Sequence, residues 1–310
     1  MTRAGLGRGA SDTAEGLALG VGAYLIWGVV PLFWPLLEPA SALEVLAHRV
    51  VWSLVVVALL LLAARRWSHA LAVLRDRRRM AYVVAGAVAV SVNWGTFIYA
   101  VNSDRVVEAS LGYFINPLIT IAFGVVFLRE RLRPLQWCAL GLALLAVVEL
   151  TWDYGHVPVI ALTLAVSFGV YGLLKKQAGI GSIEGLAVET LVLAPVALAY
   201  LGFLAVTGAL SFGAHGAGHS LLLVATGVVT AAPLLLFAGA ATRLSLTTLG
   251  MLQYIAPILQ FAIGVLVMHE HMTTGRWVGF VLVWAALVLI TVEATGHHRR
   301  TLRRAADNIV

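Results

Sequence analysis

Residues 43–64 read LEVLAHRVVWSLVVVALLLLAA, an almost unbroken apolar run whose first turns carry Glu44, His48 and Arg49. At a rise of 1.5 Å per residue, a helix of about 20 residues crosses the hydrocarbon core of a bilayer, which is about 30 Å thick. A buried helix of a soluble protein would be shorter or would carry a polar face along its length. The run therefore predicts a membrane-spanning helix.

The same pattern recurs along the chain, in apolar runs of about 18 to 22 residues separated by short polar segments. The predicted spans lie near 16–37, 43–64, 80–101, 107–128, 134–152, 157–174, 184–206, 219–241, 246–268 and 276–294. Backbone groups in lipid must be paired within a helix or a closed barrel, and the sequence lacks the alternating ten-residue segments of a barrel. We predict an all-α membrane protein of ten transmembrane helices.

Composition supports this class and excludes others. The chain is 61% hydrophobic and 12% charged, whereas a soluble domain is about 25% charged. The net charge of +6 comes from short basic clusters between apolar runs, which is typical of membrane loops and not of a nucleic-acid surface. The single cysteine, Cys138, excludes an intrachain disulfide, and no metal-ligand spacing is present. We expect neither nucleic acid, nor metal, nor another cofactor.

Basic residues fix a predicted orientation. With the N-terminus in the cytoplasm, 18 of the 21 Lys and Arg residues fall in cytoplasmic segments. Only Arg105 and Arg276 fall in outer loops, and Arg49 lies within a span. Cytoplasmic loops of membrane proteins carry an excess of Lys and Arg, so both termini are predicted to be cytoplasmic.

The chain also contains an internal repeat. A shift of 140 residues places the first half on the second at five positions: Glu44 on Glu184, Pro117 on Pro257, Gly124 on Gly264, Glu130 on Glu270, and Trp137 on Trp277. This predicts an N-terminal tail, two five-helix repeats and a basic C-terminal tail, at 1–15, 16–152, 157–295 and 296–310. Because five is odd, the second copy enters the membrane inverted, a frequent construction in transporters.

Three stretches resemble a known family. They are EVLAHRVVWS (Glu44–Ser53), the segment from Asn93-Trp94 to Asn102, and EASLGYFINPL (Glu108–Leu118). They are similar to the RarD family of chloramphenicol-sensitivity proteins, in the EamA group of the drug/metabolite transporter superfamily. In the second half LQYIAPILQF (Leu252–Phe261) is the clearest match. The resemblance covers about residues 15 to 295. It implies a permease of the bacterial inner membrane that exports a small metabolite or drug.

Charged residues within the spans are the first candidates for a site. A charge at the bilayer centre costs about 2.5 to 3.5 kcal/mol, so it is usually paired or faces a cavity. Arg49 is interpreted either as a group that binds substrate or a coupling ion, or as an arginine that reaches the outer headgroups with Glu44 as partner. Glu44 and His48, one helical turn apart, are candidate carriers of a proton.

Glu189 is the counterpart of Arg49 under the 140-residue shift. Desolvation of a buried carboxyl makes it a third candidate for proton coupling. The alternative, which we favour, is a structural ion pair with Lys175 or Lys176.

Amides, phenols and two prolines form a second group. Pro117 and Pro257 are predicted to kink their helices and to free the carbonyls of Tyr113 and Gln253. Such groups can line a neutral hydrogen-bonding cavity, or the amides can bridge neighbouring helices. The predicted substrate-binding residues are Arg49, His48, Asn93, Trp94, Tyr113, Asn116, Gln253 and Tyr254. Trp27, Trp34 and Trp152 are interpreted as interfacial anchors, and Glu130 and Glu270 as surface caps.

Absent motifs narrow the function. The sequence contains no G-x-x-x-x-G-K-[ST], so it is not expected to hydrolyse ATP, and it contains no H-E-x-x-H or G-x-S-x-G. We therefore predict a secondary transporter, not an enzyme, with a small-molecule substrate, the lipid bilayer and candidate protons as its partners. An intramembrane enzyme and a membrane sensor are the alternatives.

Overall fold

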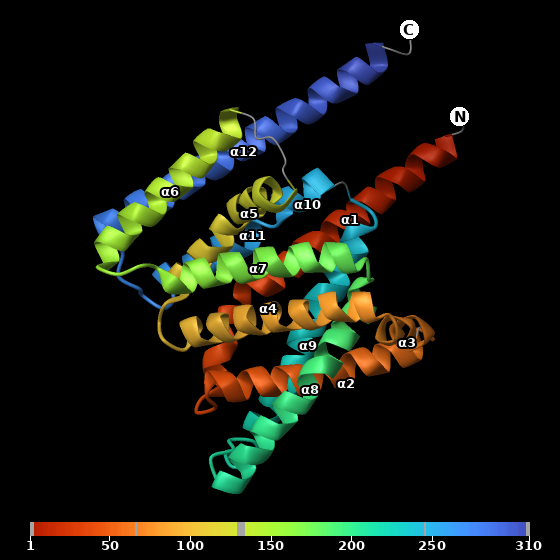
Figure 1. Cartoon of the computed structure of the whole chain (residues 1–310), viewed down its shortest axis with the longest axis vertical. Helices are drawn as coiled ribbons and strands as arrows, with labels where there is room; N and C mark the ends of the chain where they lie inside the picture. The colour runs from red at the N-terminus through yellow and green to blue at the C-terminus, as the bar shows by residue number, and fades with distance from the viewer. Residues whose placement is uncertain (1–2, 66, 129–133, 245, 308–310) are drawn as a thin grey trace.

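The computed structural model describes residues 3–65, 67–128, 134–244 and 246–307, and all regular structure in these ranges is helical (Figure 1). The predicted cap Glu130 lies outside them. The helices are α1 (Arg3–Val29), the 3-10 helices η1 (Val30–Leu32) and η2 (Trp34–Leu37), α2 (Ala42–Ala63), α3 (Trp67–Arg75), α4 (Arg77–Val101), α5 (Val106–Leu128), α6 (Pro134–Tyr154), α7 (Val159–Ala178), α8 (Ser182–Thr207), α9 (Gly216–Ala241), α10 (Leu246–Leu252), α11 (Ile255–Leu266) and α12 (Thr274–Asp307).

The helices fit a membrane environment. Among the described residues, seven helical segments are long and apolar enough to cross a bilayer, and three shorter apolar segments lie in α5, α7 and α11. Each predicted span falls on one of these ten segments. The chain is thus an all-α membrane protein, and the apolar runs of the sequence correspond to its helices.

Prolines alter the first and ninth predicted spans. The first span continues past Val29 only as η1 and η2, because Pro31 and Pro35 have no N–H to donate to an α-helix. The ninth span is divided into α10 and α11, so Pro257 lies in the first turn of α11, where a missing N–H removes no helical bond. The predicted kink at Pro257 is therefore a break between two helices, whereas Pro117 lies inside α5.

Three segments outside the predicted spans contain helical residues. The loop after the second span contains the short helix α3, whose Ala70 and Val73 are buried. The predicted tails at 1–15 and 296–310 contain the first turns of α1 and the last turns of α12. Figure 1 shows both ends of the chain projecting on the same side of the helix bundle.

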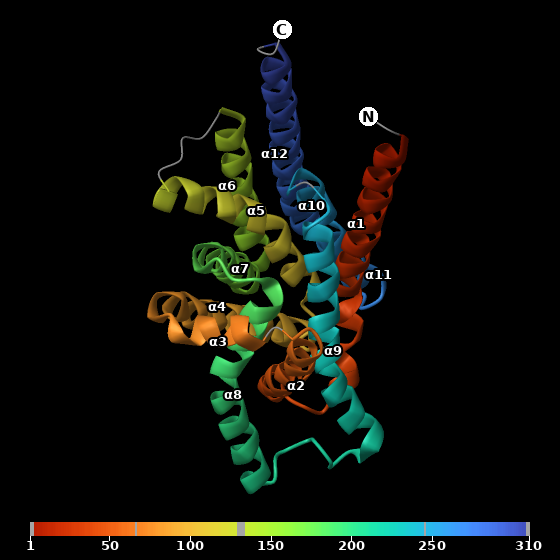
Figure 2. The ribbon, with the colours of Figure 1, turned by 90° about the vertical axis from the view of Figure 1, so that its right-hand side faces the viewer.

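The two halves of the chain are interleaved. The most extensive helix contacts each join a helix that precedes residue 155 to one that follows it: α6 with α12, α4 and α5 with α7, α2 with α8 and α9, and α1 with α9. Figure 2 shows α9 running beside α1 and crossing α2. The crossing of α2 and α9 is close, because a Cβ added to Gly227 would lie 2.5 Å from the backbone carbonyl of Trp52.

Candidate functional site

Arg49 lies in the interior, on α2, with only 8% of its surface exposed. Its Nε donates a hydrogen bond of 2.8 Å to the hydroxyl oxygen of Thr230 on α9. That hydroxyl in turn donates to the backbone carbonyl of Thr226 at 2.8 Å, which fixes its orientation. The guanidinium is therefore held in a defined position at the crossing of α2 and α9.

Two tryptophan rings flank this guanidinium. Its central carbon lies 3.9 Å from the ring centroid of Trp94, on α4, and 5.4 Å from that of Trp34, on η2. A cation over an aromatic face gains about 2 kcal/mol or more when it is desolvated. The interpretation of Trp34 as an interfacial anchor is wrong, because only 1% of its surface is exposed. The 3-10 turns that follow Pro31 carry this ring into the core.

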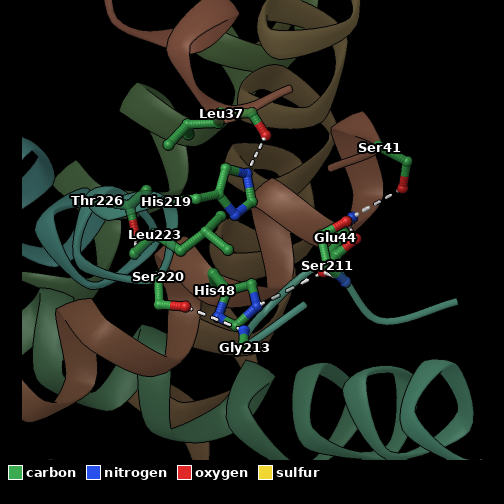
Figure 3. A network of polar contacts seen from close by, with 10 residues as sticks. All are labelled: Leu37, Ser41, Glu44, His48, Ser211, Gly213, His219, Ser220, Leu223 and Thr226. Carbon is green, nitrogen blue, oxygen red and sulfur yellow. Dashed lines mark hydrogen bonds and ion pairs between the residues drawn. The ribbon is translucent and has the colours of Figure 1, made fainter. Parts of the chain in front are cut away.

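Glu44 is engaged elsewhere and does not pair with Arg49. Its carboxylate accepts hydrogen bonds from the backbone N–H of Ser211 at 2.7 Å and from the Ser211 hydroxyl at 3.0 Å (Figure 3). In the described part of the chain, no carboxylate lies within ion-pair distance of Arg49. The structure thus does not show the alternative of an outward-reaching arginine with Glu44 as its partner.

Two buried histidines lie near Glu44. The Nε2 of His48 is 3.9 Å from a Glu44 oxygen, and its ring stacks on Phe212 at 5.2 Å. The Nε2 of His219 lies 2.9 Å from the carbonyl oxygen of Leu37, and Figure 3 shows this ring between Leu37 and His48. Sequence reasoning missed His219; the only signal was a histidine at the start of an apolar run.

Asn93 joins three helices. Its side-chain nitrogen donates to the carbonyl of Leu164 at 3.0 Å and to the hydroxyl of Ser167 at 3.1 Å, both on α7. Its oxygen accepts from the hydroxyl of Tyr113 on α5 at 3.2 Å. Asn93 therefore bridges neighbouring helices, the second of the two interpretations of the amide group, and places Tyr113 in the interior.

Similarity to known proteins assigns this chain to a family. A family model described as the EamA-like transporter family matches residues 14–152 and 157–292. The chain belongs to this family. "Protein RarD" of Streptomyces exfoliatus is 54% identical over 95% of this chain and 93% of its own length. "Chloramphenicol-sensitive protein RarD" of Pseudomonas aeruginosa is 31% identical over 94% of this chain and 98% of its own length.

Other comparisons agree with this assignment. An "Uncharacterized transporter" of Vibrio cholerae is 43% identical over 94% of this chain and 97% of its own length. A solved crystal structure that is 20% identical matches 91% of this chain and 99% of its own, with a TM-score of 0.59, which shows a shared fold. This EamA-like protein of the RarD group is a multi-pass transporter of the bacterial inner membrane.

The remaining polar candidates of the EamA-like transporter lie on other helices than Arg49. Gln253 and Tyr254 occupy the break between α10 and α11, where Tyr254 packs against the apolar cluster of α5, α6 and α12. Asn116 is half-buried on α5, one residue before Pro117. Among the described residues, neither Gln253 nor Tyr254 forms a hydrogen bond or a cation–π contact with the guanidinium.

Glu189 forms the structural pair that the sequence favoured. Its carboxylate lies 3.1 Å from the Lys175 ammonium and accepts a hydrogen bond of 3.1 Å from the hydroxyl of Tyr171. These three residues border a small hollow together with Tyr82 and Gly86 of α4. The buried acid of the second half is thus neutralised by a cation, in contrast to the buried Arg49 of the first half.

Glu270 caps a helix of the other half. Located in the loop between α11 and α12, it accepts hydrogen bonds from the backbone N–H groups of Val106 and Val107, the first residues of α5. The prediction of a simple surface cap is therefore wrong, since the carboxylate is half-buried against another element. Burial raises the pKa of Glu270 from its usual 4.5 to about 7, against the lowering effect of the two amides. The charge of Asp104 adds to the rise and that of Arg276 opposes it.

This carboxyl gives a pH-dependent stability. Because its pKa is raised in the folded protein, the stability that it contributes is complete below about pH 4.5 and is lost as the pH rises through about 7. We expect the melting temperature in detergent to fall by several degrees between pH 5 and pH 8, and Glu270→Gln to remove most of this change. Glu15→Gln, on an exposed acid, is the control. An unaltered pH profile in Glu270→Gln would contradict the assignment.

Proposed function

We propose that this EamA-like transporter is a secondary exporter that moves a small metabolite or drug by alternating access, with Arg49 in its substrate site. One observation carries the proposal: a buried cation is held by Thr230 from the second half and by Trp34 and Trp94 from the first. Transporters built from inverted repeats bind their substrates where the two repeats meet. A desolvated charge at that position is costly and is most simply explained by a binding role.

The helix boundaries support two related halves. Three helices of the first half have counterparts that begin 140 residues later: Ala42 and Ser182, Val106 and Leu246, Pro134 and Thr274. Together with the 18 basic residues assigned to one side, this regularity supports ten spans in two inverted repeats, with both termini in the cytoplasm. Rocking of one repeat against the other would expose Arg49 to each side in turn.

The polar residues then take distinct roles. His48 and Trp94 adjoin Arg49 and are proposed to contact substrate with it, whereas Asn93 positions Tyr113. Glu44, His48 and Glu189 are the proposed proton-coupling groups. Glu44 and His48 lie close enough that a proton on the histidine would be attracted to the carboxylate, and Glu189 already accepts hydrogen bonds from Lys175 and Tyr171.

Transport in proteoliposomes tests this function. Chloramphenicol is a suitable first solute because it occurs in the name of the Pseudomonas aeruginosa relative. Vesicles that contain the purified protein are expected to exchange labelled chloramphenicol several times faster than protein-free vesicles, and an imposed pH gradient is expected to change the rate. If chloramphenicol and a panel of metabolites and drugs all move at the protein-free rate, with and without the gradient, the proposal fails.

A further inference from the structure

The surroundings of Arg49 are rich in hydrogen-bond donors that lack acceptors. The Nη atoms of Arg49 make no hydrogen bond with the described residues, and neither is among the fully enclosed atoms. The indole N–H groups of Trp34 and Trp52 are enclosed and have no acceptor in the described part of the chain. Trp52 follows Arg49 by three positions on α2 and so shares its helix face. An enclosed donor without an acceptor is destabilising, because it has lost its hydrogen bonds to water.

Three side chains nearby that could accept a hydrogen bond are already engaged. Both oxygens of Glu44 accept hydrogen bonds from Ser211, and the side-chain oxygen of Asn93 accepts from Tyr113. The Thr230 hydroxyl accepts from the Nε of Arg49. These groups therefore leave the region with positive charge and unpaired N–H donors. The enclosed hydroxyl of Ser53, one helical turn after Arg49 on α2, also has no partner among the described residues and can donate to a bound ligand.

The energies favour an anion as the missing acceptor. Removal of a guanidinium from water is costly, and the cation–π contacts with Trp34 and Trp94 offset only part of this cost. With Nε bound to Thr230, the two Nη atoms present a fork that matches the two oxygens of a carboxylate. A single carboxylate balances the single charge, while a phosphate would leave an excess negative charge within the membrane.

Accordingly, we propose that the Arg49 fork and the Trp34 indole N–H bind a carboxylate, so that the substrates are small organic monocarboxylates. This inference rests on the proposed transport function, whose substrate class it names. It predicts that a carboxylate binds more tightly than a neutral molecule of the same shape. It also gives Trp34 a role that depends on its N–H as well as on its ring.

Matched pairs of ligands test the inference in the detergent-purified protein. The probes are acetate, hexanoate and benzoate, each compared with its amide, which keeps the shape and removes the charge. Binding is measured from the shift of the melting temperature with ligand concentration at constant ionic strength. We expect at least one carboxylate to bind about tenfold or more tightly than its amide, and Arg49→Gln to abolish the difference. If no carboxylate binds more tightly than its amide, the inference is overturned.

Further variants separate this role from a structural one. Arg49→Lys keeps the charge without the fork and should retain part of the preference, while Arg243→Gln removes an exposed charge and should leave it unchanged. Trp34→Phe keeps a ring and removes the N–H, and is expected to weaken carboxylate binding about tenfold. This variant keeps the inference testable if Arg49→Gln does not fold. Unchanged carboxylate binding in Trp34→Phe would remove the indole from the site.

The two proposals fail in different ways. If vesicles transport neutral solutes and the protein binds each carboxylate no more tightly than its amide, the proposed substrate class is wrong and the proposed transport function stands. If carboxylates bind through Arg49 and vesicles move no solute, the anion site remains and the transport function is wrong.

Discussion

Arg49→Ala is expected to abolish transport in proteoliposomes and to leave the protein inserted in the membrane. In the proposed complex Arg49 and the substrate carboxylate form a buried, hydrogen-bonded charge pair. Loss of one partner from such a pair costs about 3 kcal/mol, which corresponds to about a hundredfold in the rate at low substrate concentration. Insertion should not suffer, because removal of a charge from a span lowers the cost of insertion by about 2.5 to 3.5 kcal/mol. The measurement is the initial rate of labelled solute exchange, normalised to the amount of reconstituted protein.

The control for this substitution is Arg243→Ala, which removes an arginine that is exposed after α9 and pairs with Glu15. Its exchange rate should equal that of the unmodified protein. A rate of Arg49→Ala within twofold of this control would place Arg49 outside the substrate pathway, whatever its burial.

Gly227→Ala is expected to lower the stability of the protein, because the added methyl group has no space at the crossing of α2 and α9. The added Cβ would lie 2.5 Å from both the backbone carbon and the backbone oxygen of Trp52, and 2.8 Å from its Cβ. Backbone atoms cannot turn aside as a flexible side chain can, so α2 and α9 must separate. Overpacking of this kind costs about 1 to 3 kcal/mol. It should also lengthen the hydrogen bond from Arg49 to Thr230, and so reduce transport as well as the melting temperature.

Gly141→Ala, on α6, is the matched control, because a Cβ there meets no atom within 4 Å. In a helix interior alanine is favoured over glycine by about 1 kcal/mol, so this variant should melt at the same temperature or slightly higher. Equal melting temperatures for the two variants would show that the crossing of α2 and α9 is looser than the structure has it.

The membrane fold was predictable from the sequence because lipid imposes a simple constraint on length. A helix that crosses about 30 Å of hydrocarbon needs about 20 consecutive apolar residues, and such a segment is visible in the sequence itself. The run at 43–64 accordingly corresponds to α2, with bounds that agree to a residue. By contrast, α3 is nine residues long and amphipathic, so it left no run of this kind between the spans.

The site was predictable only in part, because its partners are distant in the chain. Arg49 stood out as a charge in an apolar run, yet its hydrogen-bond partner Thr230 is separated from it by 181 positions. Threonine is common in apolar helices and gave no signal. The sequence also suggested Glu44 as a partner by proximity, whereas the loop residue Ser211 takes that carboxylate. A single sequence shows which polar residues lie in apolar segments, but it does not show which of them contact each other in the folded protein.

Trp34 illustrates a second limit. A tryptophan near the end of a predicted span is usually an interfacial anchor, and the prediction followed that rule. The prolines on either side of it, Pro31 and Pro35, end the α-helix and turn the chain inward. The position of the ring thus depends on the geometry of two short 3-10 turns, which apolar length does not reveal.

The interleaving of early and late helices has a consequence for biogenesis. A ribosome that has completed α6 has released helices whose most extensive contacts are with helices not yet synthesised. At that stage Arg49 has no Thr230 to bind, and the lipid-facing first half holds an unsatisfied cation. We therefore expect the first half to reach its final packing only after α7 to α12 have been synthesised.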